Sequence, residues 1–126
     1  SAQWMWTNTS VFKNAGVAEP DTIDDFLAAA PKLKDSGVIP LALGGQPWQE
    51  GLMFGVVFSS EGYDLMQAIL KDHDVDSARG PRFRNVLENY RELQQWVDDG
   101  APGRLWNDAT AMVIEGKAGM QIMEYQ

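Results

Sequence analysis

The sequence predicts an α/β domain in which a small sheet is flanked by helices. Short apolar segments typical of strands lie near both ends of the chain and again around residues 38–43. Between them lie longer segments whose apolar residues recur at helical spacing. Strands that alternate with helices indicate this fold class. The length of 126 residues suits one compact domain with a single core, and we expect residues 1–126 to form it.

The first 37 residues predict a strand and two helices. Alternating apolar and polar residues indicate a strand over Gln3–Thr7, and a helical turn over Ser10–Ala15 ends at Gly16. Thr22 then begins a longer helix as its N-cap, with Asp25 three residues later in a pattern that resembles a capping box. The apolar face of this helix, which Gly37 ends, comprises Ile23, Phe26, Leu27, Ala30 and Leu33.

Pro31 lies inside that helical pattern. A proline within a helix removes one backbone hydrogen bond and costs about 3 kcal/mol. We therefore expect the helix to kink at Pro31 or to end early.

The middle of the chain predicts a strand and then a buried helix. "VIPLALGG" is a short apolar run, and Pro40 confines the strand to a strand start or a sheet edge. Pro47 suits the first position of a helix, and the following "WQEGLMFGVVFSSEG" is apolar almost all round. We expect this helix to be deeply buried. A second short helix follows in "YDLMQAILKD".

The last third predicts two more helices and a final strand. The acidic "DHDVDSARGP" is interpreted as a linker before the helix of "RFRNVLENYRELQQWVDDG", which Gly100 ends. A helix is expected from Asp108 to Glu115, with Gly116 as its C-cap, and a strand from Ala118 to Tyr125. The apolar stripe of the long helix comprises Phe83, Val86, Leu87, Tyr90, Leu93 and Val97.

Composition excludes several classes of function. The formal net charge is -8, which disfavours nucleic acid or an anionic membrane as a partner because both require basic patches. The chain has no cysteine, so it can form no disulfide, zinc–thiolate site or cysteine nucleophile. No apolar run approaches the roughly 20 residues of a membrane span. The first residues, "SAQWMWTN", do not have the pattern of a signal peptide.

The sequence offers no complete catalytic or metal-binding pattern. "DHDVD" has the alternate spacing of a calcium loop, but Ser77 and Phe83 stand where an EF-hand needs glycine and glutamate. His73 is the only histidine, and "LGGQP" lacks the lysine of a phosphate-binding loop. A glycosidase needs two facing carboxylates, and nothing in the sequence pairs any two acidic residues. We therefore expect no catalytic residue, metal or cofactor.

Two tryptophans form the most informative constellation. Trp48 and the "WND" of Trp106–Asp108 each lie at an expected helix start after a loop that leaves the sheet. Ligand clefts of open α/β sheets form where such loops gather. Trp48 could stack on the apolar face of a sugar, with Asn107 and Asp108 binding its hydroxyls. From the residues alone, the favoured explanation is that both tryptophans are boundary aromatics and that Asn107 or Asp108 is an N-cap.

Three segments together resemble one protein family. They are "WTNTSVFKNAGVAEPDTIDDFLAAAPKLKDSGVIPLAL", "GGQPWQEGLMFGVVF" and "WNDATAMVIEGKAGMQIM", in this order along nearly the whole chain. Their combination resembles the bacterial extracellular solute-binding proteins of family 1, specifically the periplasmic glucose- or mannose-type proteins of ABC importers. The resemblance implies part of a type II periplasmic-binding-protein fold, in which two α/β lobes enclose a sugar. The chain would correspond to the central part of the C-terminal lobe.

The resemblance also implies site residues, a partner and a location. Trp48 would stack on a monosaccharide such as glucose, and either Asn107 or Asp108 would bind a hydroxyl group. Gln49 and Glu50 are neighbours with weaker claims. The full-length parent would deliver the sugar to an ABC transporter permease from the periplasm.

A segment covering about a third of such a protein would hold only half of the cleft. We therefore expect this chain to bind sugar weakly or not at all. Apolar surface and sheet edges left open by the missing parts would favour a homodimer. The alternative is a structural or interaction domain without a ligand, such as an engineered self-associating fragment, in which both tryptophans belong to the core. The abrupt "SAQ" and "MEYQ" ends fit a fragment of this kind.

Overall fold

A computed structural model of the chain describes residues 4–123 and has the expected α/β architecture. Its sheet consists of β1 (Met5–Thr7), β2 (Ile39–Ala42) and β3 (Ala118–Ile122), in the order β1-β3-β2. The central strand β3 is antiparallel to β1 and parallel to β2, so that Met120 lies opposite both Thr7 and Leu41. Every residue of β3 is buried, as expected for a strand covered on both faces.

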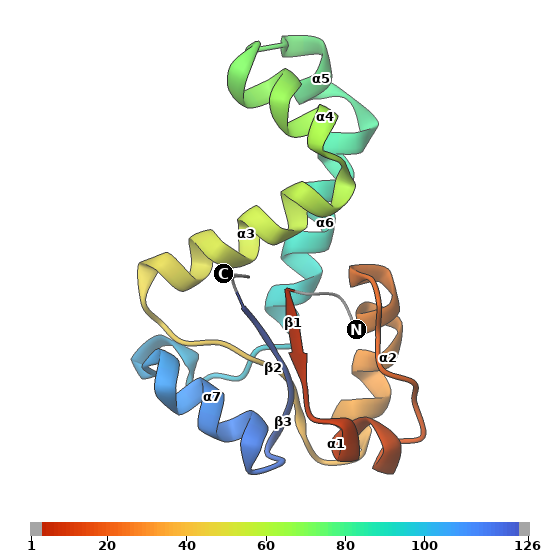
Figure 1. Ribbon diagram of the computed structural model, residues 1–126, viewed down its shortest axis with the longest axis vertical. Coiled ribbons are helices and arrows are strands. Elements are labelled where there is room, and N and C mark those ends of the chain that lie inside the picture. The colour runs from red at the N-terminus through yellow and green to blue at the C-terminus, as the bar shows by residue number, and fades with distance from the viewer. Residues whose placement is uncertain (1–3, 124–126) are drawn as a thin grey trace.

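Helices lie on both sides of this sheet (Figure 1). Helices α1 (Thr9–Asn14) and α2 (Ile23–Asp35) lie on one side, and α7 (Trp106–Ile114) lies on the other. The main core joins Phe12, Phe26 and Leu33 of α1 and α2 to Leu41 and Met120 of the sheet. A smaller cluster joins α7 to the sheet, and it consists of Ala42, Ala109, Val113 and Ala118.

The remaining helices extend away from the sheet (Figure 1). Helices α3 (Pro47–Glu61) and α6 (Pro81–Gln95) lie side by side, and Phe54 of α3 packs edge-on against Tyr90 of α6. The tip beyond them contains α4 (Tyr63–Met66), the π-helical turn η1 (Gln67–Lys71) and α5 (Val75–Arg79). A 3-10 turn, η2 (Ala101–Gly103), leads from α6 toward α7.

Several local expectations are confirmed. Thr22 caps α2 by accepting the N–H of Asp25 at 3.0 Å. Gly37 follows this helix with a φ of 93°. Pro40 lies in β2, which is an edge strand, so its missing N–H breaks no ladder between two neighbouring strands. The first and last strands are shorter than expected, with Gln3 and Tyr125 outside the described residues.

Other expectations are wrong for physical reasons. Of the two expectations for Pro31, an early end of α2 is wrong, because Ala30 and Leu33 on either side of Pro31 are fully buried and hold the chain helical as far as Asp35. The acidic segment is not only a linker. Asp74 caps α5 by accepting the N–H of Asp76 at 3.1 Å, so this segment is partly helical.

Two apolar surfaces are also more open than expected. Leu87 of α6 is 47% exposed, because the packing of α3 against α6 does not extend to that part of the apolar stripe. Helix α3 buries Met53 and Val57 but leaves Trp48 exposed and Leu52 half-buried. It is therefore not deeply buried all round. Helix α7 begins at Trp106, two residues before the expected Asp108.

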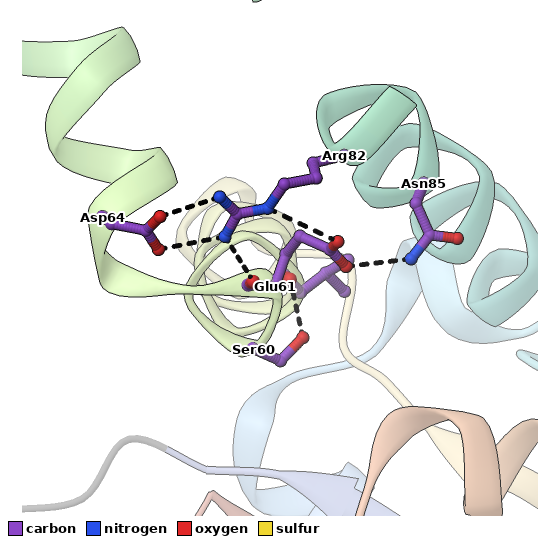
Figure 2. A network of polar contacts seen from close by, with 6 residues as sticks. Ser60, Glu61, Asp64, Arg82 and Asn85 are labelled. Carbon is purple, nitrogen blue, oxygen red and sulfur yellow. Dashed lines mark hydrogen bonds and ion pairs between the residues drawn. The ribbon is translucent and has the colours of Figure 1, made fainter. Parts of the chain in front are cut away.

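A polar network fixes the corner between α3 and the tip (Figure 2). The chain turns at Gly62, whose φ of 140° favours glycine. Arg82, in the first turn of α6, donates to both carboxylate oxygens of Asp64 at 2.7 and 2.9 Å and to the backbone oxygen of Glu61 at 2.9 Å. Asn85 donates to the Glu61 carboxylate at 2.9 Å. The hydrogen bonds from Arg82 are the main cause that lowers the pKa of Asp64 to about 2.

The contrast between Leu93 and Leu87 gives a matched test of the packing of α6. Leu93 is 1% exposed, whereas Leu87 on the same helix is 47% exposed. Leu93→Ala should lower the free energy of unfolding by about 2–5 kcal/mol, because it removes buried methyl groups and leaves a cavity. Leu87→Ala should change it by less than about 0.5 kcal/mol. Urea denaturation measures both values, and equal losses would contradict the burial described for α6.

The Asp64 network makes a prediction about pH. Arg82→Gln should return the pKa of Asp64 from about 2 toward its ordinary value of 3.8, as measured by NMR titration of the carboxyl group. Because folding lowers this pKa, the ion pair stabilises the folded chain above about pH 3.8, and its contribution disappears as the pH falls through about 2. An Asp64 pKa that is the same in both proteins would refute the contact.

Candidate functional site

The starts of α3 and α7 form the candidate site. Trp48, the second residue of α3, packs against Trp106, the first residue of α7, with ring centroids 5.1 Å apart and planes inclined by 45°. Trp48 is 51% exposed, and Trp106 is half-buried. Asn107 and Asp108 follow in the first turn of α7, and both are exposed. The structure therefore brings together the two tryptophans that are far apart in the sequence, and we call this pair with Asn107 and Asp108 the tryptophan platform.

Two loops carry the platform, and their backbones approach closely. The N–H of Gly45 donates to the carbonyl oxygen of Arg104 at 2.8 Å. A Cβ atom on Gly45 would overlap the carbonyl oxygen of Pro102, so only glycine allows this approach. Pro47 then starts α3 with a residue that has no N–H to satisfy. The Gly-Gly-Gln-Pro sequence thus sets the direction in which α3, and with it Trp48, leaves the sheet.

An arginine clamp supports the same loops from the other side. Arg104 donates to both carboxylate oxygens of Asp98, each at 2.7 Å, and to the carbonyl oxygen of Leu43 at 3.1 Å. The hydrogen bonds from Arg104 lower the pKa of Asp98 below its ordinary value, so this carboxylate stays charged at neutral pH. This clamp ties the end of β2 to the segment between α6 and α7. Its residue types and spacing give no sequence signal that would have found it.

Gln49 lies beneath the platform and not on its surface. Its side chain is 1% exposed. Its amide oxygen accepts the N–H of Gly44 at 2.8 Å, and its amide nitrogen donates to the side-chain oxygen of Gln46 at 2.8 Å. Gln46, which sequence reasoning did not single out, also accepts the N–H of Trp106 at 3.2 Å. Gln49 is therefore engaged in bracing the loop before α3.

Glu50 points toward α6. Its carboxylate accepts a hydrogen bond from the Tyr90 hydroxyl, and it lines a hollow of about 420 Å³ together with Gly45, Asp98 and Asp99. Burial, and then the hydrogen bond to Glu50, raise the pKa of Tyr90 to about 12, so its hydroxyl remains a donor. Neither tryptophan lines this hollow. Glu50 thus belongs to a surface separate from the tryptophan platform.

The described residues hold neither a metal-binding cluster nor a membrane-spanning helix. Residues 4–123 contain no group of three or more histidine, cysteine, aspartate or glutamate side chains placed to hold a metal ion. Within the same range, none of the helices combines the length and the apolar character needed to cross a membrane. His73 lies exposed in the tip with a φ of 54°.

Comparison with known sequences gives matches along nearly the whole chain. Residues 1–125 match the family described as bacterial extracellular solute-binding protein. A protein of Mesorhizobium japonicum named "Probable sugar-binding periplasmic protein" is 44% identical over 124 residues, which cover 98% of this chain and 30% of that protein. A protein of Rhizobium meliloti with the same name is 39% identical over 123 residues, again covering 98% of this chain and 30% of the relative.

Solved structures give a consistent fold. The bacterial solute receptor AcbH, described as having an exclusive substrate preference for β-D-galactopyranose, matches with a TM-score of 0.75 and 30% identity over 94% of this chain and 30% of its own. A chitin oligosaccharide binding protein matches with a TM-score of 0.77 over 93% of this chain and 30% of its own. At 21% identity, this second likeness shows the fold alone.

The chain spans about 30% of the length of these two curated relatives. Within that span, the sequence matches and the solved structure of AcbH both belong to solute-binding proteins. Residues 1–125 match the family, and 98% of this chain aligns with a relative at 44% identity. The chain therefore belongs to the bacterial extracellular solute-binding proteins.

Proposed function

We propose that this chain forms one wall of a sugar-binding cleft in a longer solute-binding protein, and that the tryptophan platform contacts the sugar. The observation that carries the proposal is the half-exposed Trp48 ring, held against Trp106 with two exposed polar side chains in the adjacent turn. A half-exposed indole ring beside exposed polar side chains offers both an apolar face and hydrogen-bonding groups to a ligand. A sugar ring is a suitable ligand.

The chemistry of the platform suits a neutral sugar. The C–H face of a pyranose packs on an aromatic ring, while its hydroxyl groups need hydrogen-bonding partners. Asp108 offers carboxylate oxygens that accept from hydroxyl groups, and Asn107 offers an amide that both donates and accepts. We assign Gln49 a supporting role, because its amide is buried and bonded within the chain. Glu50 is a weaker candidate, because it faces Tyr90.

The identity of the sugar and the partner are part of the same proposal. We infer glucose or a close monosaccharide relative as the ligand, with an ABC transporter permease as the partner and the periplasm as the location. The names of the two rhizobial relatives support a periplasmic sugar-binding protein, and an ABC transporter extracellular-binding protein of Pyrococcus horikoshii, 32% identical, supports the transporter. The segment would belong to the C-terminal lobe of the longer protein.

One wall of a cleft binds a sugar only weakly. Tight ligand sites bury 70–90% of the ligand surface, whereas a sugar on an open platform keeps much of its surface in water. We therefore propose a millimolar or weaker affinity for the 126-residue chain, which corresponds to roughly -4 kcal/mol or less.

The first test is a titration that follows tryptophan fluorescence. Glucose should change the emission of the wild-type chain with a dissociation constant in the millimolar range or above, and Trp48→Ala should abolish the change because it removes the stacking surface. Tyr63→Ala is the matched control, since Tyr63 is another exposed aromatic residue but lies in the tip. It should leave the titration unaltered.

The same titration can contradict the proposal. A low-micromolar affinity would show that one wall suffices and would overturn the expectation of weak binding. A signal that stays constant for glucose, mannose and galactose far above the millimolar range would favour the alternative of a structural or interaction domain.

The second test concerns the polar part of the platform. Asp108→Asn should weaken glucose binding by about tenfold, because it replaces a charged acceptor with a neutral one. Asp24→Asn is the matched control, because Asp24 is an exposed carboxylate in the first turn of α2 and lies outside the platform. Saturation-transfer NMR measures both affinities.

Asn107→Ala, measured in the same way, decides which of the two neighbours binds the hydroxyl group. A loss only in this variant would assign the role to Asn107. Equal affinities in the wild type and both platform variants would remove Asn107 and Asp108 from the proposed site.

A further inference from the structure

Gln46 joins the two helix starts that carry the tryptophan platform. It immediately precedes α3 as its N-cap, yet its side chain forms no capping bond with that helix. Its amide oxygen instead accepts the N–H of Trp106 at 3.2 Å and the side-chain N–H of Gln49 at 2.8 Å. The side chain of Gln46 therefore points across to the other loop, although Gln46 and Trp106 are 60 residues apart in the sequence.

This bond replaces a cap that α7 lacks. Leu105, the N-cap residue of α7, has no side-chain oxygen and makes no capping bond. The first N–H groups of a helix have no partner within the helix itself. Gln46 satisfies the one that belongs to Trp106, and it does so from the residue two positions before Trp48. The hydrogen bond thus connects the backbones that bear the two rings.

Gln49 holds the Gln46 side chain in the required orientation. The N–H of Gly44 can only donate, so the Gln49 side chain must present its oxygen to Gly44 and its nitrogen to Gln46. Gln46 must then present its oxygen, which is also what the N–H of Trp106 requires. Two backbone donors therefore fix the orientation of both amides.

We propose that Gln46 is a positioning residue, which sets the separation and inclination of the Trp48 and Trp106 rings without contacting the sugar. This positioning role deepens the proposed function and rests on it, because it serves binding only if the platform contacts a sugar. The ring arrangement itself can be measured without any ligand.

The experiment compares variants at position 46 by circular dichroism. Two tryptophan rings 5.1 Å apart at an angle of 45° give a far-ultraviolet exciton couplet, and Trp48→Phe defines the spectrum without it. Gln46→Leu removes the acceptor at similar size and should reduce the couplet by more than half. Gln46→Glu keeps an oxygen for both donors and should retain it. Gln95→Leu, on the exposed surface of α6, is the matched control and should also retain it.

Hydrogen exchange and a second disruptive variant, Gln46→Asn, keep the test decisive if Gln46→Leu fails to fold. Hydrogen exchange of the Trp106 N–H should be slow in the wild type and in Gln46→Glu, and faster by at least fivefold in Gln46→Leu. Gln46→Asn keeps the amide but is one methylene too short to reach both donors, so it should behave like Gln46→Leu. Cooperative urea unfolding of each variant shows that the fold is intact.

The outcomes separate this inference from the proposed function. A couplet and a Trp106 exchange rate that remain unchanged in folded Gln46→Leu or Gln46→Asn would overturn the positioning role, and so would a wild type without a couplet. Loss of the couplet in these variants and its retention in Gln46→Glu would support that role even if glucose does not bind. Where glucose does bind, Gln46→Leu should raise the dissociation constant about fivefold.

Discussion

The close approach of two backbones, at Gly45 and at Pro102–Arg104, is the constraint on which the candidate site depends. The Gly45 N–H donates to the Arg104 carbonyl, and the absence of a side chain on Gly45 leaves room for the Pro102 carbonyl. Because these loops follow β2 and precede α7, their contact brings the starts of α3 and α7 to the same place. The contact between Trp48 and Trp106, and the bond from Gln46, require this approach. A side chain at position 45 would separate the loops before any ligand could matter.

Polar contacts of long sequence separation reinforce this constraint. Arg104 holds Leu43 and Asp98, and Arg82 holds the corner of α3 through Asp64 and Glu61. Both guanidinium groups remain charged at any physiological pH, and each forms two hydrogen bonds with a carboxylate, the geometry that arginine provides best. The two ends of α3 are thereby fixed by the loops at its start and by α6 at its end. Helix α3 thus connects the platform to the tip.

Local signals in the sequence predicted much of the fold, and long-range partners account for what they missed. Thr22 with Asp25, Gly37 and the edge proline Pro40 act on their own neighbours in the chain, so their roles could be predicted. Leu87 could not be separated from Leu93 by helical spacing, because spacing gives the apolar face but not the width of what covers it. At the site, the positions of Trp48 and Trp106 at two helix starts were predicted. Gln46 bonds Trp106 and Arg104 bonds Leu43 across separations of 60 and 61 residues. No pattern in the sequence identifies partners so far apart.

The inclination of 45° between the Trp48 and Trp106 rings determines what the pair can offer to a flat group. A ring that lies parallel to Trp48 meets Trp106 at an angle, so the two indoles cannot act as equivalent faces. The more exposed Trp48 provides a floor, and Trp106 forms a sloping side of it. A flat group stacked on Trp48 is therefore prevented from moving toward Trp106 but can still move in the other directions. The remaining directions would have to be closed by groups that lie beyond these two helix starts.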